Sequence, residues 1–574
     1  MLLAAIAPAL RAQDAPSASA VSCNEFLVPK QEIRGKLIGQ DQCQMIETDF
    51  TYLGRKFRRL DMGITGTIDG YVPKEGRYDK YFSANPEFNV VQGGNKNPIH
   101  YGIGQYDMNK GNAVIFIYPL DKSTWNGKEF VTAHGAGVSF VAGNLKRWDK
   151  NLEPANPMAD LSKYEKLMLE KGYAVAKTRR STPMQGGDTV VTLEDGTVFT
   201  DRNLTEQPRL IMWEAMVGWN VLAKRLGSAP TRTYWYGHSG GARPGRIVNY
   251  QPGVNVTMDG KHVIDGVIVD DAGSGQWQPV VMKNGKDVLF TPEEDLPWFA
   301  TENKSFKADP KSFSGANHRN WFVPTIEIVH LLYVNETPDD PPEFATTNFL
   351  ANKRLNAKVL RDKGLGNKQR AYEIDGISHS GGENYENGRN AAGNIEIIDM
   401  SRLMDGFIDL LDNWAEKGVA PPPTRSNWAR LGDADGDGVI ENPAIQMPEI
   451  SCPTGVYHIN PAGQGGGQGN TGFMPFTGKG LEPVDRRGIV PSEEDNHFYN
   501  YVDLNHNGVR DFVENMTEAW RRIGYLKPNE KFNRERYSVC VKNSVDRLIV
   551  EKFFKPKTGD LYKEQAKTIQ FPSE

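Results

Sequence analysis

A serine between glycines is the most chemically informative feature of the chain. Residues 231–243 run as a β-type segment into Gly237-His238-Ser239-Gly240-Gly241, which fits a G-x-S-x-G pattern at a sharp strand-to-helix turn. Such a turn needs small flanking residues, because the backbone around the serine is strained and crowded. Ser239 is therefore the candidate nucleophile, whereas the ring of His238 is expected to serve packing.

A serine hydroxyl is a weak nucleophile, so the chemistry also needs a histidine that accepts its proton. Downstream, the strand-like run 369–374 breaks into a loop rich in glycine and serine, 375–382, which contains His379. Only ten histidines occur in the chain, and one at the end of a late strand is where this chemistry places its base. His379 is the candidate base.

An acid that orients the histidine is expected between the nucleophile and the base, at the end of a strand. Glu336 is the first carboxylate after the apolar run 325–334, and it ranks first. Asp339 ranks second. Asp270 and Asp271 end an earlier strand-like run and stay open as alternatives, since they are equally suited to a helix cap or an ion pair.

The developing oxyanion needs backbone N–H donors. His134-Gly135-Ala136-Gly137 follows a short β-type run and is similar to the glycine-rich loops that donate such an N–H. Together with the residue after the nucleophile, this predicts an oxyanion hole formed by Gly135 or Ala136 with Gly240.

The C-terminal region carries a second pattern, D-x-[DN]-x-[DN]-G-x5-E, which is typical of a calcium loop. Its expected ligands are Asp503, Asn505, Asn507, Val509, Asp511 and Glu514. A weaker match offers Asp433, Asp435 and Asp437 but has Ala444 where the closing glutamate belongs. We expect a structural Ca²⁺, with no cofactor for catalysis.

These residues need elements that position them. Apolar β-type runs alternate with helical patterns, which predicts an α/β fold with a mostly parallel sheet. The expected strands and helices are 129–133, 159–171, 173–177, 205–226, 232–236, 263–270, 325–334, 369–374 and 397–417. The aromatic-rich segment 272–322 is too long for an ordinary connection and is either a lid over the site or an irregular surface excursion.

Chain length predicts more than one unit, because 574 residues exceed what one hydrophobic core supports. We divide the chain into a signal peptide (1–20), a β-rich entry to the sheet (21–128), a catalytic core (129–418) and a C-terminal extension (419–574). Consecutive prolines at 421–423 mark the last boundary.

Composition limits the partners and the compartment. A formal net charge of -5 gives no basic field for nucleic acid or an anionic membrane. Apart from residues 2–10, no apolar run approaches the length of a membrane span. Four cysteines permit three pairings, of which we favour Cys23–Cys43 and Cys452–Cys540. A secreted or periplasmic protein is expected.

The order of these motifs resembles that of a family of mostly uncharacterised, exported bacterial α/β-hydrolase-domain proteins. The resemblance covers about residues 45–530 and rests on H-G-A-G, G-H-S-G-G, N-E-T, I-S-H-S-G-G and the two acidic loops. It implies an α/β-hydrolase fold with a triad of Ser239, Glu336 and His379, although Pro338 stands where an acidic residue is expected. It implies no particular substrate.

The sequence therefore predicts a serine hydrolase that cleaves carboxylic esters through an acyl-enzyme. The aromatic segment 272–322 favours phenolic esters or polyesters as substrates. An amidase or lactonase would use the same residues. A calcium-dependent binding or scaffold protein that keeps the fold without activity is the alternative of another class.

Overall fold

A computed structural model provides the structure of the protein. It describes residues 20–33, 36–69, 103–107, 114–134, 157–158, 161–179, 190–193, 198–200, 208–242, 245, 255, 257, 261–271, 280–283, 286–289, 323–331, 366–379, 381, 398–425, 444–459, 471–476 and 515–571.

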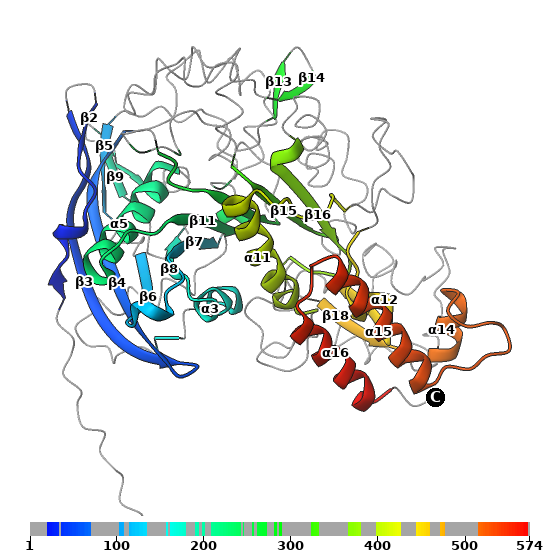
Figure 1. The fold of residues 1–574 in the computed structure, drawn as a ribbon. Coiled ribbons are helices and arrows are strands. Elements are labelled where there is room, and N and C mark those ends of the chain that lie inside the picture. The colour runs from blue at the N-terminus through cyan, green and yellow to red at the C-terminus, as the bar shows by residue number, and fades with distance from the viewer. Residues whose placement is uncertain are drawn as a thin grey trace, which may run out of the picture.

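A 14-stranded sheet runs through the centre of the molecule (Figure 1). Six neighbouring strands of the sheet are parallel: β8 (Ala174–Arg179), β7 (Lys128–His134), β11 (Arg232–His238), β12 (Gly266–Asp270), β15 (Thr325–His330) and β16 (Gln369–Ile374). β11, β12 and β15 are buried almost throughout, as expected for parallel strands covered on both faces. The protein is thus a mixed α/β protein with a largely parallel central sheet.

The other side of the sheet is antiparallel. A long hairpin of β3 (Lys36–Tyr52) and β4 (Arg55–Asp69) joins the parallel strands through β6 (Val114–Pro119). Its two-residue turn, Leu53-Gly54, has positive φ at both positions, which suits the twist of a hairpin. The sequence analysis expected a β-rich entry to the sheet at 21–128 but did not predict this long hairpin. The remaining strands of this side are β1 (Val21–Ser22), β2 (Gln31–Ile33), β5 (Ile103–Asp107), β9 (Val190–Leu193) and β10 (Val198–Thr200).

Helices cover both faces of the sheet. α5 (Pro208–Leu226) packs on one face, where its apolar residues join those of β7 and β11 in one core cluster. α3 (Lys163–Glu170) and α11 (Ser401–Lys417) pack on the other face in a second cluster. Alternate residues of a strand point to opposite faces, so each parallel strand contributes to both cores. The helices expected at 205–226 and 397–417 correspond to α5 and α11.

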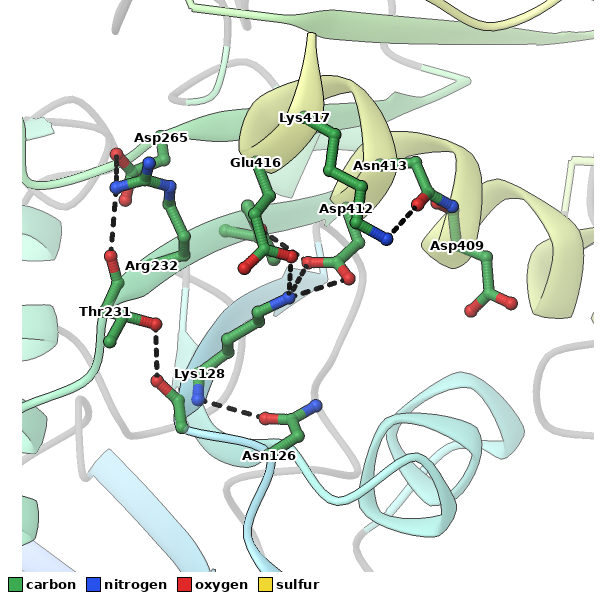
Figure 2. A network of polar contacts seen from close by, with 12 residues as sticks. Asn126, Lys128, Thr231, Arg232, Asp265, Asp409, Asp412, Asn413, Glu416 and Lys417 are labelled. Carbon is green, nitrogen blue, oxygen red and sulfur yellow. Dashed lines mark hydrogen bonds and ion pairs between the residues drawn. The ribbon is translucent and has the colours of Figure 1, made fainter. Parts of the chain in front are cut away.

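Ion pairs fix α11 to the beginning of the parallel strands (Figure 2). Lys128 opens β7, and its Nζ lies 2.7 Å from Asp412 and 2.6 Å from Glu416. The Tyr234 hydroxyl of β11 donates to the same Asp412 at 2.6 Å. Burial lowers the pKa of Lys128, but the two carboxylates outweigh it and the net pKa is raised. Lys128 is therefore held charged, and α11 cannot shift along the sheet without breaking this network.

The C-terminal helices gather beside the β16 side of the sheet (Figure 1). Arg425 and Ile445 form bridges to β16, so this part of the chain covers the edge strand. It contains α12 (Pro448–Ser451), β17 (Gly455–Ile459), β18 (Thr471–Pro475), α14 (Met516–Arg522), α15 (Arg534–Val550) and α16 (Pro556–Thr568). Short elements elsewhere are η1 (Asn24–Phe26), η4 (Lys122–Thr124), η10 (Gly366–Lys368) and the hairpin of β13 (Val280–Lys283) and β14 (Lys286–Leu289).

Both expected disulfides are confirmed. Cys23 pairs with Cys43 across 20 residues, and Cys452 pairs with Cys540 across 88 residues. The second bond joins the end of α12 to α15. Among the helices in the ranges given above, none is long and apolar enough to cross a membrane.

Candidate active site

Ser239 lies at the turn that follows β11. Its φ is 54°, a left-handed conformation that a residue with a side chain adopts only when its surroundings enforce it. The short helix η5 (Ser239–Ala242) begins at this residue. A Cβ on Gly237 would lie 2.2 Å from the carbonyl oxygen of Gly241, so the close approach of this turn requires glycine there. The sequence expectation of a crowded strand-to-helix turn is met in this geometry.

His379 faces the serine from the loop after β16. Its Nε2 lies 2.9 Å from Ser239 Oγ, although the two residues are 140 positions apart. Its Nδ1 lies 2.5 Å from Asp271 Oδ2. The His379 side chain is 20% exposed, whereas Asp271 is fully buried. The imidazole thus connects a buried carboxylate with a hydroxyl at the surface of the site.

Asp271 directly follows β12 and also has a positive φ, 45°. Its backbone N–H donates to the carbonyl of Ile328 at 3.0 Å, and its Oδ1 accepts the backbone N–H of His330 at 3.2 Å. Both partners belong to the neighbouring strand β15. A buried carboxylate is costly unless it is hydrogen-bonded, and these contacts stabilise Asp271 in its strained conformation.

The carboxylate opposite His379 is therefore one that the sequence analysis ranked behind Glu336. Glu336 and Asp339 lie outside the described residues. A neutral imidazole has one N–H to donate while its other nitrogen accepts from the serine, and Asp271 takes that N–H. The two candidates follow neighbouring strands of the sheet: Asp271 comes directly after β12, whereas Glu336 comes after β15 in the sequence.

His238 holds the backbone of the loop after β16 that carries His379, which we call the histidine loop. Its Nε2 lies 2.6 Å from the main-chain carbonyl of His379. Because a carbonyl oxygen only accepts, His238 must carry its proton on Nε2 and donate. The same loop is fixed at Gly381, whose carbonyl accepts from the Tyr164 hydroxyl at 3.2 Å and from the N–H of Met400 at 3.1 Å. The sequence analysis expected only packing from His238.

Two further polar residues of the site were not singled out by the sequence analysis in these roles. Tyr236 donates its hydroxyl to Asp270 Oδ2 at 2.9 Å. His330 places its Nε2 2.8 Å from Asp270 Oδ1. For His330 a signal was available, because it ends the strand-like run 325–330 and a polar residue at the end of a buried parallel strand points to a site.

The remaining expected site residues are only partly described. Gly240 lies in η5 directly after the nucleophile, as an N–H donor to an oxyanion should. Gly135 and Ala136 lie outside the described residues, as do both acidic loops of the C-terminal region and most of the segment 272–322.

Ring nitrogens of His238, His330 and His379 lie within 4.8 Å of one another, a spacing that invites comparison with a metal centre. Each ring already has a partner, respectively the His379 carbonyl, Asp270, and the pair of Ser239 and Asp271. A cation would have to displace these contacts. We therefore assign the cluster to the hydrogen bonds of His238 and His379 and to the contact of His330 with Asp270.

Solved esterases have similar structures over about half of this chain. Esterase 2 of Thermogutta terrifontis, phosphonylated by sarin, is 12% identical and aligns over 56% of this chain and 97% of its own, with a TM-score of 0.29. Carboxyl esterase 2 of the mycorrhizal fungus Tuber melanosporum is 12% identical over 49% of this chain and 74% of its own, with a TM-score of 0.25. A Pyrococcus furiosus esterase is 12% identical over 46% and 76%, with a TM-score of 0.22.

No protein-family model matches this sequence, and no curated protein matches it. The function proposed below therefore rests on the geometry of Ser239, His379 and Asp271.

Proposed function

We propose that the protein is a serine hydrolase of the α/β-hydrolase fold that cleaves carboxylic esters, with Ser239, His379 and Asp271 as its triad. One observation carries the proposal: Ser239 Oγ, His379 and Asp271 form a continuous hydrogen-bonded chain, with distances of 2.9 and 2.5 Å. A serine hydroxyl, an imidazole and a buried carboxylate in this order are the parts that acyl transfer needs.

In this mechanism His379 Nε2 accepts the Ser239 proton while Oγ attacks the ester carbonyl carbon. Asp271 stabilises the imidazolium that forms and keeps the ring in the tautomer that faces the serine. The N–H of Gly240 and one from the loop at 135–136 would hold the oxyanion. The imidazolium then protonates the leaving alcohol, and a water activated by the same ring hydrolyses the acyl-enzyme.

The strand order supports the fold assignment. Reading from β4, the sheet runs β4-β6-β8-β7-β11-β12-β15-β16, and the serine follows the central strand β11 while the histidine follows the last one. In open α/β sheets the sites lie at the carboxyl ends of the strands. Asp271 and His379 also follow such ends.

For the substrate we propose esters with an aromatic or polymeric group, because aromatic residues are concentrated in the segment 272–322. For the compartment we propose export, because two disulfides suit an oxidising environment.

The test compares the wild-type protein with Ser239→Ala on p-nitrophenyl esters of increasing acyl length, on a p-nitroanilide and on a lactone. Ester turnover should fall by at least about 10³-fold in Ser239→Ala, and a fluorophosphonate should label only the wild type. Ser228→Ala is the control, because Ser228 is exposed in the turn before β11. Equal turnover by Ser239→Ala would contradict the mechanism, and preferred cleavage of the anilide or lactone would reassign the substrate class.

A further inference from the structure

A second histidine–carboxylate pair lies directly behind the proposed triad. His330 Nε2 is 2.8 Å from Asp270 Oδ1, and both side chains are fully buried. Asp270 is the chain neighbour of Asp271, and His330 ends the strand that pairs with β12. The triad acid and this pair are therefore built on the same two strand ends.

Asp271 depends on His330 in two ways. The backbone N–H of His330 donates to Asp271 Oδ1, and the His330 ring places Nδ1 3.6 Å from Asp271 Oδ2, the oxygen that faces His379. The Asp270 carboxylate holds the other side of the ring, and the Tyr236 hydroxyl holds Asp270. A displacement of His330 would therefore move the carboxylate on which the base depends.

Charge gives the pair a further role. Asp270 and Asp271 are adjacent in the chain and fully buried, and two ionised carboxylates so close repel each other strongly at low dielectric. A positive imidazole between them would balance one of the two charges. His379 would then experience one net negative charge from the group of Asp270, Asp271 and His330, instead of two.

We propose that Asp270 and His330 form an ion pair that positions the triad acid and sets the charge next to His379. This rests on the proposed function, since it assigns the pair to the same reaction. His330 and Asp270 are positioning residues, because they act on the serine only through Asp271 and His379.

The surroundings of His330 fit this assignment. The Gly381 backbone closes the site on the side of the ring carbon Cε1, where a Cβ would lie 3.2 Å from that atom. The titratable groups around the ring come from β11, from the end of β12, from the histidine loop and from α3: His238, Tyr236, Asp270, Asp271, His379 and Tyr164. Asp270 is the nearest ionisable oxygen that these contacts give to the ring.

The test uses three variants of the full chain. His330→Gln keeps the backbone N–H and an amide donor near Asp270 but removes the positive ring. Asp270→Asn keeps the shape and an acceptor for Tyr236. The double variant Asp270→Asn with His330→Gln has neither charge and can restore a neutral amide pair.

In His330→Gln, kcat per active site should fall about 10- to 100-fold with KM within about twofold of the wild type. The acidic limb of the kcat/KM profile, which follows protonation of the free base, should move up by about one pH unit, because an unbalanced carboxylate holds the proton on His379. The double variant should return this limb towards the wild type. A structural role alone would lower the Tm without moving the limb.

Fluorophosphonate titration counts the reactive serines and separates the two possible failures. A wild type with neither labelling nor ester turnover would overturn the proposed function. Normal labelling with an acidic limb that is the same in the wild type and in all three variants would overturn the ion pair alone. In protein labelled with ¹⁵N-histidine, the ring resonances of His379 report its protonation without any turnover. The ion pair is therefore tested even if the protein cleaves no ester. If His330→Gln does not fold, Asp270→Asn takes its place in the comparison.

Discussion

Asp271 Oδ2 lies 2.5 Å from His379 Nδ1, so the carboxylate that meets the histidine follows β12. β12 and β15 are adjacent parallel strands, and the carboxyl ends of parallel strands meet at the same edge of a sheet. An acid delivered from either strand could reach the same imidazole. In this protein the end of β15 supplies His330 and its backbone N–H, which support the acid from the neighbouring strand.

The first prediction distinguishes Asp271 from Glu336, the acid that the sequence analysis ranked first. Asp271→Asn should lower kcat for an ester by about 10⁴-fold, because the amide favours the wrong tautomer of His379. Glu336→Gln should leave kcat within about twofold. Steady-state kinetics on a p-nitrophenyl ester measures both. A large loss in Glu336→Gln together with an active Asp271→Asn would return the role of the acid to Glu336.

The sequence predicted most of the elements that carry the site, because buried parallel strands and amphipathic helices have strong patterns. The runs 232–236 and 369–374 correspond to β11 and β16, and the glycine pattern at 237–241 marked the strained turn. The choice of acid could not be made this way. Chain order places several carboxylates between Ser239 and His379, and only the contact between Asp271 and His379 in the folded chain shows which one faces the ring.

The length of the β3–β4 hairpin could not be predicted from the sequence pattern either. Its strands have 17 and 15 residues, but they include charged and polar positions such as Arg59 and Asp61, which interrupt an apolar alternation. These two side chains are fully buried and pair with each other at 2.7 Å. The buried ion pair therefore places two charged residues in the middle of a strand, where the sequence pattern of a strand would have apolar ones.

A second prediction concerns Glu129 of β7, which is fully buried. Burial raises the pKa of Glu129 well above its ordinary value of 4.5. The folded protein therefore binds this proton at pH values where the unfolded chain has released it, so the contribution of Glu129 to stability is full below pH 4.5 and is lost as the pH rises.

Glu129→Gln removes this dependence. Its free energy of unfolding relative to the wild type should increase between pH 5 and pH 8, by at least about 1 kcal/mol and by at most about 1.4 kcal/mol per pH unit. Guanidinium titrations at both pH values measure the difference, with Glu535→Gln on the exposed face of α15 as the control for lost charge. A difference that stays constant with pH would contradict the prediction.

A third prediction tests the attachment of α11. Lys128→Met should destabilise the protein by about 1–3 kcal/mol, because the carboxylates of Asp412 and Glu416 then lose the cation that lies between them in a partly buried site. Lys417→Met is the matched control. Lys417 donates to Asn413 on the same helix at 2.9 Å but is exposed, and its loss should cost less than about 0.5 kcal/mol. If chemical denaturation gave the same loss of unfolding free energy for Lys128→Met and Lys417→Met, the network at Lys128 would contribute no more to stability than an exposed lysine.

The last prediction concerns calcium in the C-terminal region, where the loop 503–514 lies outside the described residues. The described chain resumes at Asn515, whose side chain caps α14 by accepting the N–H of Glu518 at 2.9 Å. A calcium loop whose final ligand is Glu514 would run directly into this helix, as a loop of this type does.

Removal of calcium with EGTA should therefore lower the Tm by several degrees, since an ion bound only to the folded state stabilises it by mass action. Asp503→Asn with Glu514→Gln should abolish the response to added Ca²⁺. Asp437→Asn changes the weaker loop and should leave most of the response intact. Ester turnover at temperatures well below the Tm should stay the same, because the proposed acyl transfer by Ser239, His379 and Asp271 uses no metal ion. Loss of turnover on chelation without any change in Tm would instead place the ion at the catalytic site.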